Sequence, residues 1–252
     1  MSAPGHAFGI DIGGSGVKGA AVDLTTGELV HERVKIATPR PATPEAVAAT
    51  TARLVAEAGW DGPVGVTMPS VVLDGVVRTA ANIDKSWIGV DARALFSDAL
   101  GGREVTVLND ADAAGLAEDR YGAAAEHRGL VLLLTFGTGI GSALLYNGTL
   151  VPNSELGHLE IGGMEAEHRA AASVKDRLGL SYEQWAVEVS TVLSGLEDLF
   201  WPNVIVAGGG ISRDADRWIP LLTNRTPVVA ARLRNTAGIV GAAMAIQGHL
   251  AP

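Results

Sequence analysis

The pair Asn109-Asp110 ends the apolar segment VTVLND, and an open α/β sheet binds its ligands at such strand ends. A carboxylate there can accept the proton of an attacking hydroxyl, as phosphoryl transfer to an alcohol requires. The alternative is structural, because Asp110 could simply cap the helix predicted over DADAAGLAEDRYG. The residues alone leave both roles open. Asp112, two positions further on, is given only a structural role.

Two glycine-rich turns share one plan. The plan is a strand, a Gly-rich turn, a second strand, a Gly-centred turn and a short third strand. It is found in residues 8–30 (FGIDIGGSGVKGAAVDLTTGELV) and again in residues 133–151 (LLTFGTGIGSALLYNGTLV). Asp11 precedes the first turn and Thr135 precedes the second. One copy would be an ordinary hairpin, but two copies favour loops whose backbone N–H groups bind phosphate.

The glycines of the first turn also satisfy G-x-G-x-x-G, but a strand follows them instead of the helix that a dinucleotide site needs. That interpretation is therefore rejected. Asp11 can hold Mg²⁺ directly or through water, and Lys18 adds a cation. A third glycine turn follows the strand VIVA. The residues expected at phosphate are Asp11, Gly13, Gly14, Ser15, Gly16 and Lys18, then Thr135, Gly137, Thr138 and Gly139, and Gly208, Gly209 and Gly210 in the third turn.

Strands and helices alternate around these turns, which predicts α/β layers with mixed sheets. Thr43 and Asp91 stand as N-caps before two helical segments, and Gly59 ends the first of them. Further helices are predicted near 166–178 and 182–200, and NTAGIVGAAMAIQG forms the last helix.

Composition excludes several classes of protein. The chain has no cysteine, so it has neither disulfides nor cysteine-ligated zinc, which fits a cytoplasmic location. We expect no signal peptide and no membrane span, because no apolar run reaches the required ~20 residues. The formal net charge of −9 argues against nucleic-acid binding.

The segment NSELGHLEIGG places Glu155 and His158 in an E-x-x-H spacing. On a helix this pair could ligate a metal ion, but Pro152 and Gly157 predict a loop. The tetrapeptide alone does not decide its function.

The segments IDIGGSGVKG, TFGTGIGSAL and VIVAGGGIS resemble, in this order, the two phosphate loops and the adenosine-side glycine turn of the sugar kinase/actin/heat-shock ATPase superfamily. The resemblance implies two ribonuclease-H-like halves with mixed sheets, flanking helices and a central cleft. The expected small half is 1–109, completed by a C-terminal helix at about 236–252, and the large half is 110–235.

Asn109-Asp110 and the E-x-G-H segment resemble the catalytic and sugar-binding motifs of the ROK group of sugar kinases. This implies that Asp110 is the general base and that Asn109, Asp110, Glu155 and His158 bind hexose. Most ROK proteins continue with a cysteine-rich zinc motif that ends in a sugar-binding glutamate. This chain reads GGMEAEHRAAA there, which implies no zinc and leaves Glu167 as the third sugar-binding carboxylate.

Longer segments (TAANIDKSWIG, LNDADAAGLAE, LTFGTGIGSA, ELGHLE, AGGGIS and NTAGIVGAAMA) resemble the zinc-free branch of that family, the polyphosphate glucokinases. The resemblance covers nearly the whole chain. It implies that Asn82 contacts the sugar, while Trp87 either walls the sugar site or packs in the core. Where sugar kinases usually carry Pro-Gly, this chain has Pro69-Ser70.

The implied activity is a glucokinase that transfers a phosphoryl group from inorganic polyphosphate, ATP or both to the 6-hydroxyl of glucose, with Mg²⁺ and as a homodimer. Whether mannose is also accepted stays open. A polyphosphate chain needs cations beyond the loops, and Lys85 and Lys175 are the residues we name for it. The alternatives are an ATP-only ROK hexokinase, a sugar-sensing ROK regulator, whose added helix-turn-helix has no room before Phe8, and an actin-like ATPase, which predicts no E-x-G-H.

Overall fold

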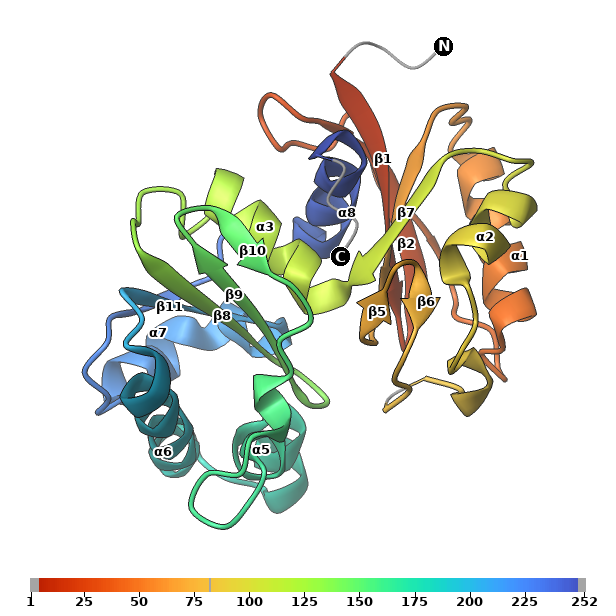
Figure 1. The fold of residues 1–252 in the computed structure, drawn as a ribbon. Coiled ribbons are helices and arrows are strands. Elements are labelled where there is room, and N and C mark those ends of the chain that lie inside the picture. Colours follow the sequence, from red (N-terminus) through yellow and green to blue (C-terminus); the bar gives the residue numbers. More distant parts are fainter. Residues whose placement is uncertain (1–4, 82, 249–252) are drawn as a thin grey trace. The chain divides into compact units, whose positions relative to one another are not determined.

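The computed structural model describes residues 5–81 and 83–248, and the chain forms two compact units (Figure 1). Unit 1 comprises Met1–Ala117 and Thr236–Pro252, and unit 2 comprises Glu118–Asn235. These units divide between residues 117 and 118, inside helix α3 (Asp110–Tyr121), whereas the expected boundary lies between residues 109 and 110.

Unit 1 is built on a five-stranded sheet in the order β3-β2-β1-β4-β7. β1 and β2 are antiparallel, as are β2 and β3, whereas β4 is parallel to both β1 and β7. The strands are β1 (His6–Gly13), β2 (Gly16–Asp23), β3 (Val34–Ile36), β4 (Val64–Met68) and β7 (Val105–Asn109), and the short pair β5 (Val72–Leu73) and β6 (Val76–Val77) forms a separate ribbon.

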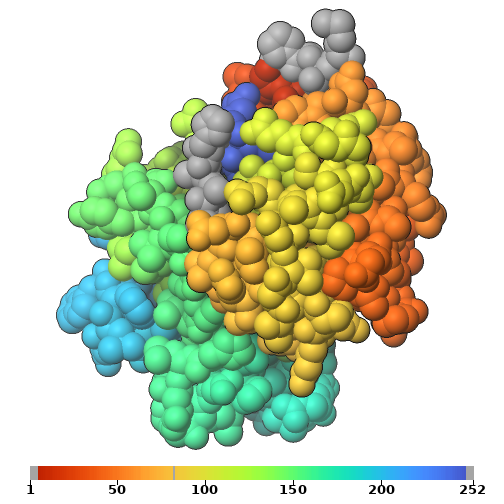
Figure 2. All heavy atoms as spheres, turned by 45° about the vertical axis from the view of Figure 1, so that its right-hand side comes forward, coloured from red at the N-terminus to blue at the C-terminus, as the bar shows by residue number. Residues whose placement is uncertain are grey.

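Helices cover both faces of this sheet. α1 (Pro44–Glu57) and α2 (Ala92–Ala99) lie side by side on one face (Figures 1 and 2), and α8 (Ala237–Gly248) packs on the other (Figure 1). The predicted caps are confirmed, since the side chains of Thr43 and Asp91 accept from the amides of Ala46 and Ala94. Glycine allows the close approach of α8, because a Cβ at Gly9 would lie 1.8 Å from the Ile239 carbonyl oxygen.

Unit 2 repeats the same sheet with the order β10-β9-β8-β11-β12 and the same strand directions. The predicted duplication is therefore confirmed. Its core includes Phe136, Trp185 and Trp218, whose rings meet edge to face. The elements are β8 (Leu130–Phe136), β9 (Ile140–Tyr146), β10 (Thr149–Val151), α4 (Ala166–Ala170), α5 (Ala172–Leu178), α6 (Tyr182–Phe200), β11 (Val204–Gly208), α7 (Ala215–Trp218) and β12 (Val228–Ala230).

Two expectations about these elements were wrong. The third strand of the first copy was predicted in TTGELV, but only Val22 and Leu29 form a bridge there, and β3 starts at Val34 after the exposed residues 31–33. The single helix predicted over 166–178 breaks at Ala171, whose backbone is extended. The indole N–H of Trp185 donates to the Ala170 carbonyl at the break, over 3.0 Å.

Short 3-10 turns lie in several loops, among them η1 (Lys85–Trp87) and η2 (Leu156–His158). In the described part of the chain, no helix combines the length and apolar character that crossing a bilayer requires.

Candidate active site

The structure places Asn109 and Asp110 at the junction of β7 and α3. Asn109 is buried, and its side-chain oxygen accepts from the amides of Ala111 (2.8 Å) and Asp112 (3.1 Å). Its amide nitrogen donates to the carbonyl oxygen of Ser70 over 3.2 Å, which ties the Pro69-Ser70 loop to this strand end. Asn109 thus caps the helix, and Asp110, its partly exposed first residue, contributes as well because its Oδ1 also accepts from the Ala111 amide over 2.8 Å.

Asp11 and Lys18 form an ion pair across β1 and β2. Lys18 Nζ lies 3.0 Å from Asp11 Oδ2, both side chains are about one-fifth exposed, and the Thr67 hydroxyl donates to Asp11 Oδ1 over 3.4 Å. Asp11 and Lys18 are direct cross-strand partners, which explains the pairing. Lys18 thus compensates the charge of Asp11, and its role at phosphate stays a prediction.

The first glycine loop is a tight hairpin in which Gly13 and Gly16 are cross-strand partners. The Thr38 hydroxyl donates to the Gly13 carbonyl over 2.5 Å. Gly13 and Gly14 line a pocket of about 290 Å³ together with Arg40. Sequence reasoning missed Arg40, although the segment TPRPATP, with a proline on either side of the arginine, marks a rigid turn.

The second loop is ordered by unit 2 itself. The amide of Gly137 donates to the Gly139 carbonyl over 2.9 Å, so this amide is not directed at a phosphate. Ser173 follows the break at Ala171, and its amide and hydroxyl donate to the carbonyls of Gly137 and Thr138 over 3.0 and 2.6 Å. The helix break therefore gives the loop two hydrogen bonds.

Glu167 lies directly against this loop. A Cβ at Gly139 would lie 2.2 Å from Glu167 Oε2, whereas a Cβ at Gly137 would have no heavy atom within 4 Å. The Ile140 amide donates to the same carboxylate over 3.3 Å. Glycine at 139 thus leaves room for the Glu167 carboxylate, and of the two glycines only Gly137 has the open face that was expected for both.

The third glycine turn lies beside the second loop, because Gly208 pairs with Thr135 across β11 and β8. Gly209 has a φ of +83°, and a Cβ there would lie 2.3 Å from the Phe136 carbonyl oxygen, so no other residue fits. Residues of both glycine segments line one pocket of about 560 Å³. Its lining consists of Phe136, Gly137, Thr138, Ala172, Ser173, Asp176, Gly210, Ile211, Arg213 and Asp214.

Glu155 precedes η2 and His158 is its last residue, and His158 lies within a group of carboxylates. His158 Nε2 lies 3.6 Å from Glu155 Oε2, and its Nδ1 lies 3.3 Å from Glu165 Oε2 and 3.8 Å from Glu167 Oε1. Burial raises the pKa of Glu155; the neighbouring His158 lowers it and the charge of Glu167 raises it further. The structure thus brings together three of the residues expected at the sugar, and Glu165, which sequence reasoning missed, lies beside them.

This group could also hold a metal ion. One ligand atom from each of His158, Glu165 and Glu167 lies within 4.8 Å of the others. His168 Nδ1 is 3.8 Å from Glu165 Oε2, so a second imidazole borders the group. Imidazole and carboxylate are ligands that zinc accepts, so the absence of cysteine does not by itself exclude zinc here.

The structure decides the role of Trp87 and leaves those of Lys85, Lys175 and Asn82 as predictions. Trp87 is fully buried, and its indole donates to the Ala42 carbonyl over 3.0 Å, so it belongs to the core of unit 1 and does not wall a sugar. Lys85 is exposed on η1, and Lys175 Nζ lies 4.5 Å from the ring centroid of Tyr182. Asn82 lies outside the described residues.

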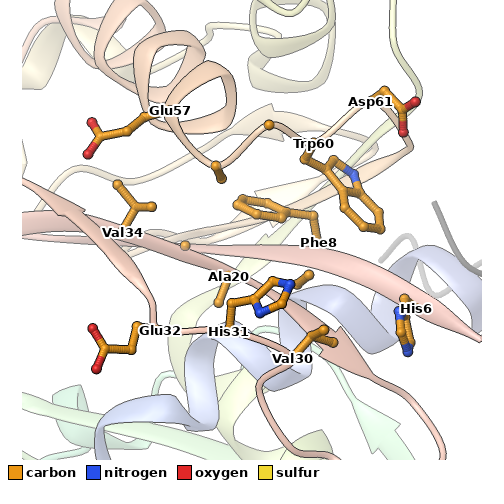
Figure 3. A pocket seen from close by; sticks show the side chains of 14 residues that line it. His6, Phe8, Ala20, Val30, His31, Glu32, Val34, Glu57, Trp60 and Asp61 are labelled. Atoms are coloured by element: carbon orange, nitrogen blue, oxygen red, sulfur yellow. The ribbon is translucent and has the colours of Figure 1, made fainter. Parts of the chain in front are cut away.

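A separate pocket of about 400 Å³ in unit 1 lies away from these motifs (Figure 3). Phe8 and Trp60 lie together in it, with ring centroids 5.6 Å apart. The described residues that line it include the acids Glu32, Glu57 and Asp61 and the histidines His6 and His31, but no lysine or arginine. Its charge does not suit a phosphate chain.

A model described as the ROK family matches residues 7–173, more than half of the chain. The chain belongs to the ROK family. This ROK protein is 64% identical over 240 residues to a polyphosphate glucokinase of Mycobacterium tuberculosis (strain CDC 1551 / Oshkosh), covering 95% of this chain and 91% of that protein. The resemblance to the polyphosphate glucokinase branch is therefore confirmed.

Solved structures agree with the fold of this ROK protein. The inorganic polyphosphate/ATP-glucomannokinase from Arthrobacter sp. strain KM superposes with a TM-score of 0.93 at 52% identity, over 97% of this chain and 99% of that one. A ROK family glucokinase from Streptomyces griseus, in complex with glucose and AMPPNP, gives a TM-score of 0.81 at 25% identity, over 95% and 98%. The predicted sugar-kinase fold is confirmed.

Proposed function

We propose that this protein is a glucokinase that transfers a phosphoryl group from inorganic polyphosphate or ATP to the 6-hydroxyl of glucose. The 64% identity to a polyphosphate glucokinase across 95% of the chain carries this conclusion. The site residues support it, because an acid stands at the end of β7 and two glycine loops repeat in the two sheets.

Asp110 is the general base in this proposal. Asn109 holds the first turn of α3 and the Ser70 carbonyl, so it fixes the backbone from which the Asp110 carboxylate projects. That carboxylate would accept the proton of the glucose 6-hydroxyl as the oxygen attacks the terminal phosphorus. Glu155, His158 and Glu167 would orient the sugar through its other hydroxyls.

Asp11 is the residue that would hold Mg²⁺. Its carboxylate and the nearby Thr67 hydroxyl are oxygen ligands of the kind this ion prefers, and the Lys18 ammonium at 3.0 Å favours a bond through water over a direct one. When bound, Mg²⁺ would offset the negative charge of the donor phosphates.

The two donors would be distinguished outside the phosphate loops. The 560 Å³ pocket between the second loop and the Gly208–Gly210 turn suits a nucleoside, while Arg213 at its edge suits further phosphates. Of the cations named for polyphosphate, Lys175 already contacts Tyr182 and Asp176 (3.7 Å), which makes the exposed Lys85 the more accessible of the two.

One assay tests the function directly: initial rates with polyphosphate or ATP as donor and with glucose or mannose as acceptor. We expect glucose 6-phosphate from both donors, with the polyphosphate rate falling as salt rises because salt screens its charges. Turnover with ATP alone would leave the ATP-only ROK hexokinase. Sugar binding without turnover would favour the regulator instead.

Activity should require added Mg²⁺ and should not depend on zinc. Elemental analysis of the purified protein, before and after dialysis against a chelator, checks this expectation together with the rate after metal is restored. Stoichiometric zinc that is lost in the Glu165→Gln variant would contradict it and would assign the metal to the His158, Glu165 and Glu167 group.

Replacing Glu155 with glutamine should stabilise the free protein while weakening glucose binding. Burial raises the pKa of Glu155, so the folded state keeps a proton that the unfolded state has lost, and the free energy of unfolding falls as pH rises above about 4.5. Glutamine removes that cost at neutral pH. The gain in Tm should be small, because the side chain is 39% exposed, and it should vanish below pH 4.5.

Calorimetry of the same variant should show weaker glucose binding, since one acceptor of hydroxyl hydrogen bonds loses its charge. Glu160→Gln, at an exposed neighbour, is the control and should change neither quantity. A Glu155→Gln protein with lower Tm and unchanged glucose affinity would mean that Glu155 is structural.

A further inference from the structure

Two chain segments link the units of this protein. One is the Ala117–Glu118 bond inside α3, and the other is the Asn235–Thr236 bond before α8. The first link lies in the helix that begins at Asp110, so a residue that holds the two links together influences the proposed base without touching a substrate.

Glu118 occupies such a position. It is the first residue of unit 2, and its side chain is 1% exposed. Oε1 accepts from the amide of Leu233 over 2.7 Å, and Oε2 accepts from the amides of Arg232 (3.0 Å) and Ala123 (2.7 Å). The carboxylate thus joins the first link to the residues that lead into the second.

The local sequence is adapted to this arrangement. A Cβ at Gly122 would lie 2.0 Å from Glu118 Oε2, so glycine leaves the space that the carboxylate occupies. The Glu118 carbonyl accepts from the amides of Gly122 and Ala124 over 3.0 and 3.1 Å. Three backbone N–H groups donate to this carboxylate, and they compensate the free-energy cost of burying its charge.

We propose that Glu118 is a positioning residue that holds the two linking segments together and so fixes α3, the helix that begins at Asp110, for phosphoryl transfer. This rests on the proposed function, in which Asp110 is the general base. Asp110 and Glu118 lie about two turns apart on the same helix, so a shift of α3 moves the base. A displacement of about 1 Å at a catalytic group can cost ~10²-fold in rate.

A buried carboxylate can also serve stability alone, and Glu197 offers a matched control for that role. It lies in the same unit and is also 1% exposed. It accepts from the side-chain amide of Asn224 (2.9 Å), from the Arg225 amide (3.1 Å) and from the Thr226 amide. The chemistry is the same, but the segment that it holds is not one of the links.

The experiment compares Glu118→Gln, Gly122→Ala and Glu197→Gln with the wild type. Gly122→Ala displaces the Glu118 carboxylate without removing its charge, so it tests the same contact if Glu118→Gln does not fold. Hydrogen exchange should accelerate at the amides of Arg232 and Leu233 in the two Glu118-directed variants. Their kcat/KM for glucose phosphorylation should fall about tenfold or more. Glu197→Gln should lose comparable Tm but keep kcat/KM within about twofold.

Equal kinetic losses in all three variants, or accelerated exchange at Arg232 and Leu233 with kcat/KM unchanged, would overturn the proposal. A wild-type protein without glucose phosphorylation would instead refute the proposed function and leave the exchange result standing.

Discussion

Replacing Asp110 with asparagine should abolish phosphoryl transfer while glucose still binds. The loss of a general base costs ~10²–10⁴-fold in rate, and asparagine keeps the size of the side chain without its basicity. Asp110 starts α3 and is partly exposed, so the neutral side chain should fit without repacking. Steady-state kinetics with both donors and glucose calorimetry measure the two expectations separately.

Asn109→Ala is the informative companion to this variant. It removes the hydrogen bonds to the amides of Ala111 and Asp112, and losing such a cap costs roughly 1 kcal/mol of stability. We therefore expect a lower Tm for Asn109→Ala and an almost unchanged Tm for Asp110→Asn. If Asp110→Asn keeps most of the wild-type kcat, Asp110 is not the base, and if it loses Tm as Asn109→Ala does, its role is structural.

The parts of this protein that sequence reasoning predicted correctly depend on short segments. Thr43 and Asp91 cap their helices because a cap needs only the amides of the next turn. The duplicated sheets follow from two local patterns of strand and glycine turn. Similarly, Asn109-Asp110 lies at a strand end because an apolar run stops there, although the catalytic role of Asp110 remains a prediction.

The features that sequence reasoning missed or left open depend on contacts that a short segment does not specify. Trp87 packs against Phe96 in the core, and nothing next to it in the sequence distinguishes this from a sugar-binding wall. Glu165 was missed because its partner His158 lies across the GGM turn, and the break at Ala171 depends on Trp185 in the following helix. A short sequence pattern does not specify which partner a side chain finds in the folded chain.

Gly139→Ala should be the most damaging single-methyl change in the second glycine loop, because of Glu167. The new Cβ would lie 2.2 Å from Glu167 Oε2 and would displace a carboxylate that accepts from the Ile140 amide and is proposed to bind glucose. We expect a lower Tm and a loss of roughly 10²-fold in kcat/KM, as misplaced catalytic groups can cause.

Gly137→Ala is the matched change two residues earlier, where an added Cβ has no protein atom within 4 Å. Its Tm should stay at the wild-type value, and any kinetic loss should appear in the KM of the phosphoryl donor, because this open face is the part of the loop proposed to lie against the donor phosphate. A double-mutant cycle of Gly139→Ala with Glu167→Ala completes the argument. If the clash with Glu167 is the cause, the double variant should be no less stable than Glu167→Ala alone. Additive losses would mean that Gly139 is required for its backbone and not for the carboxylate beside it.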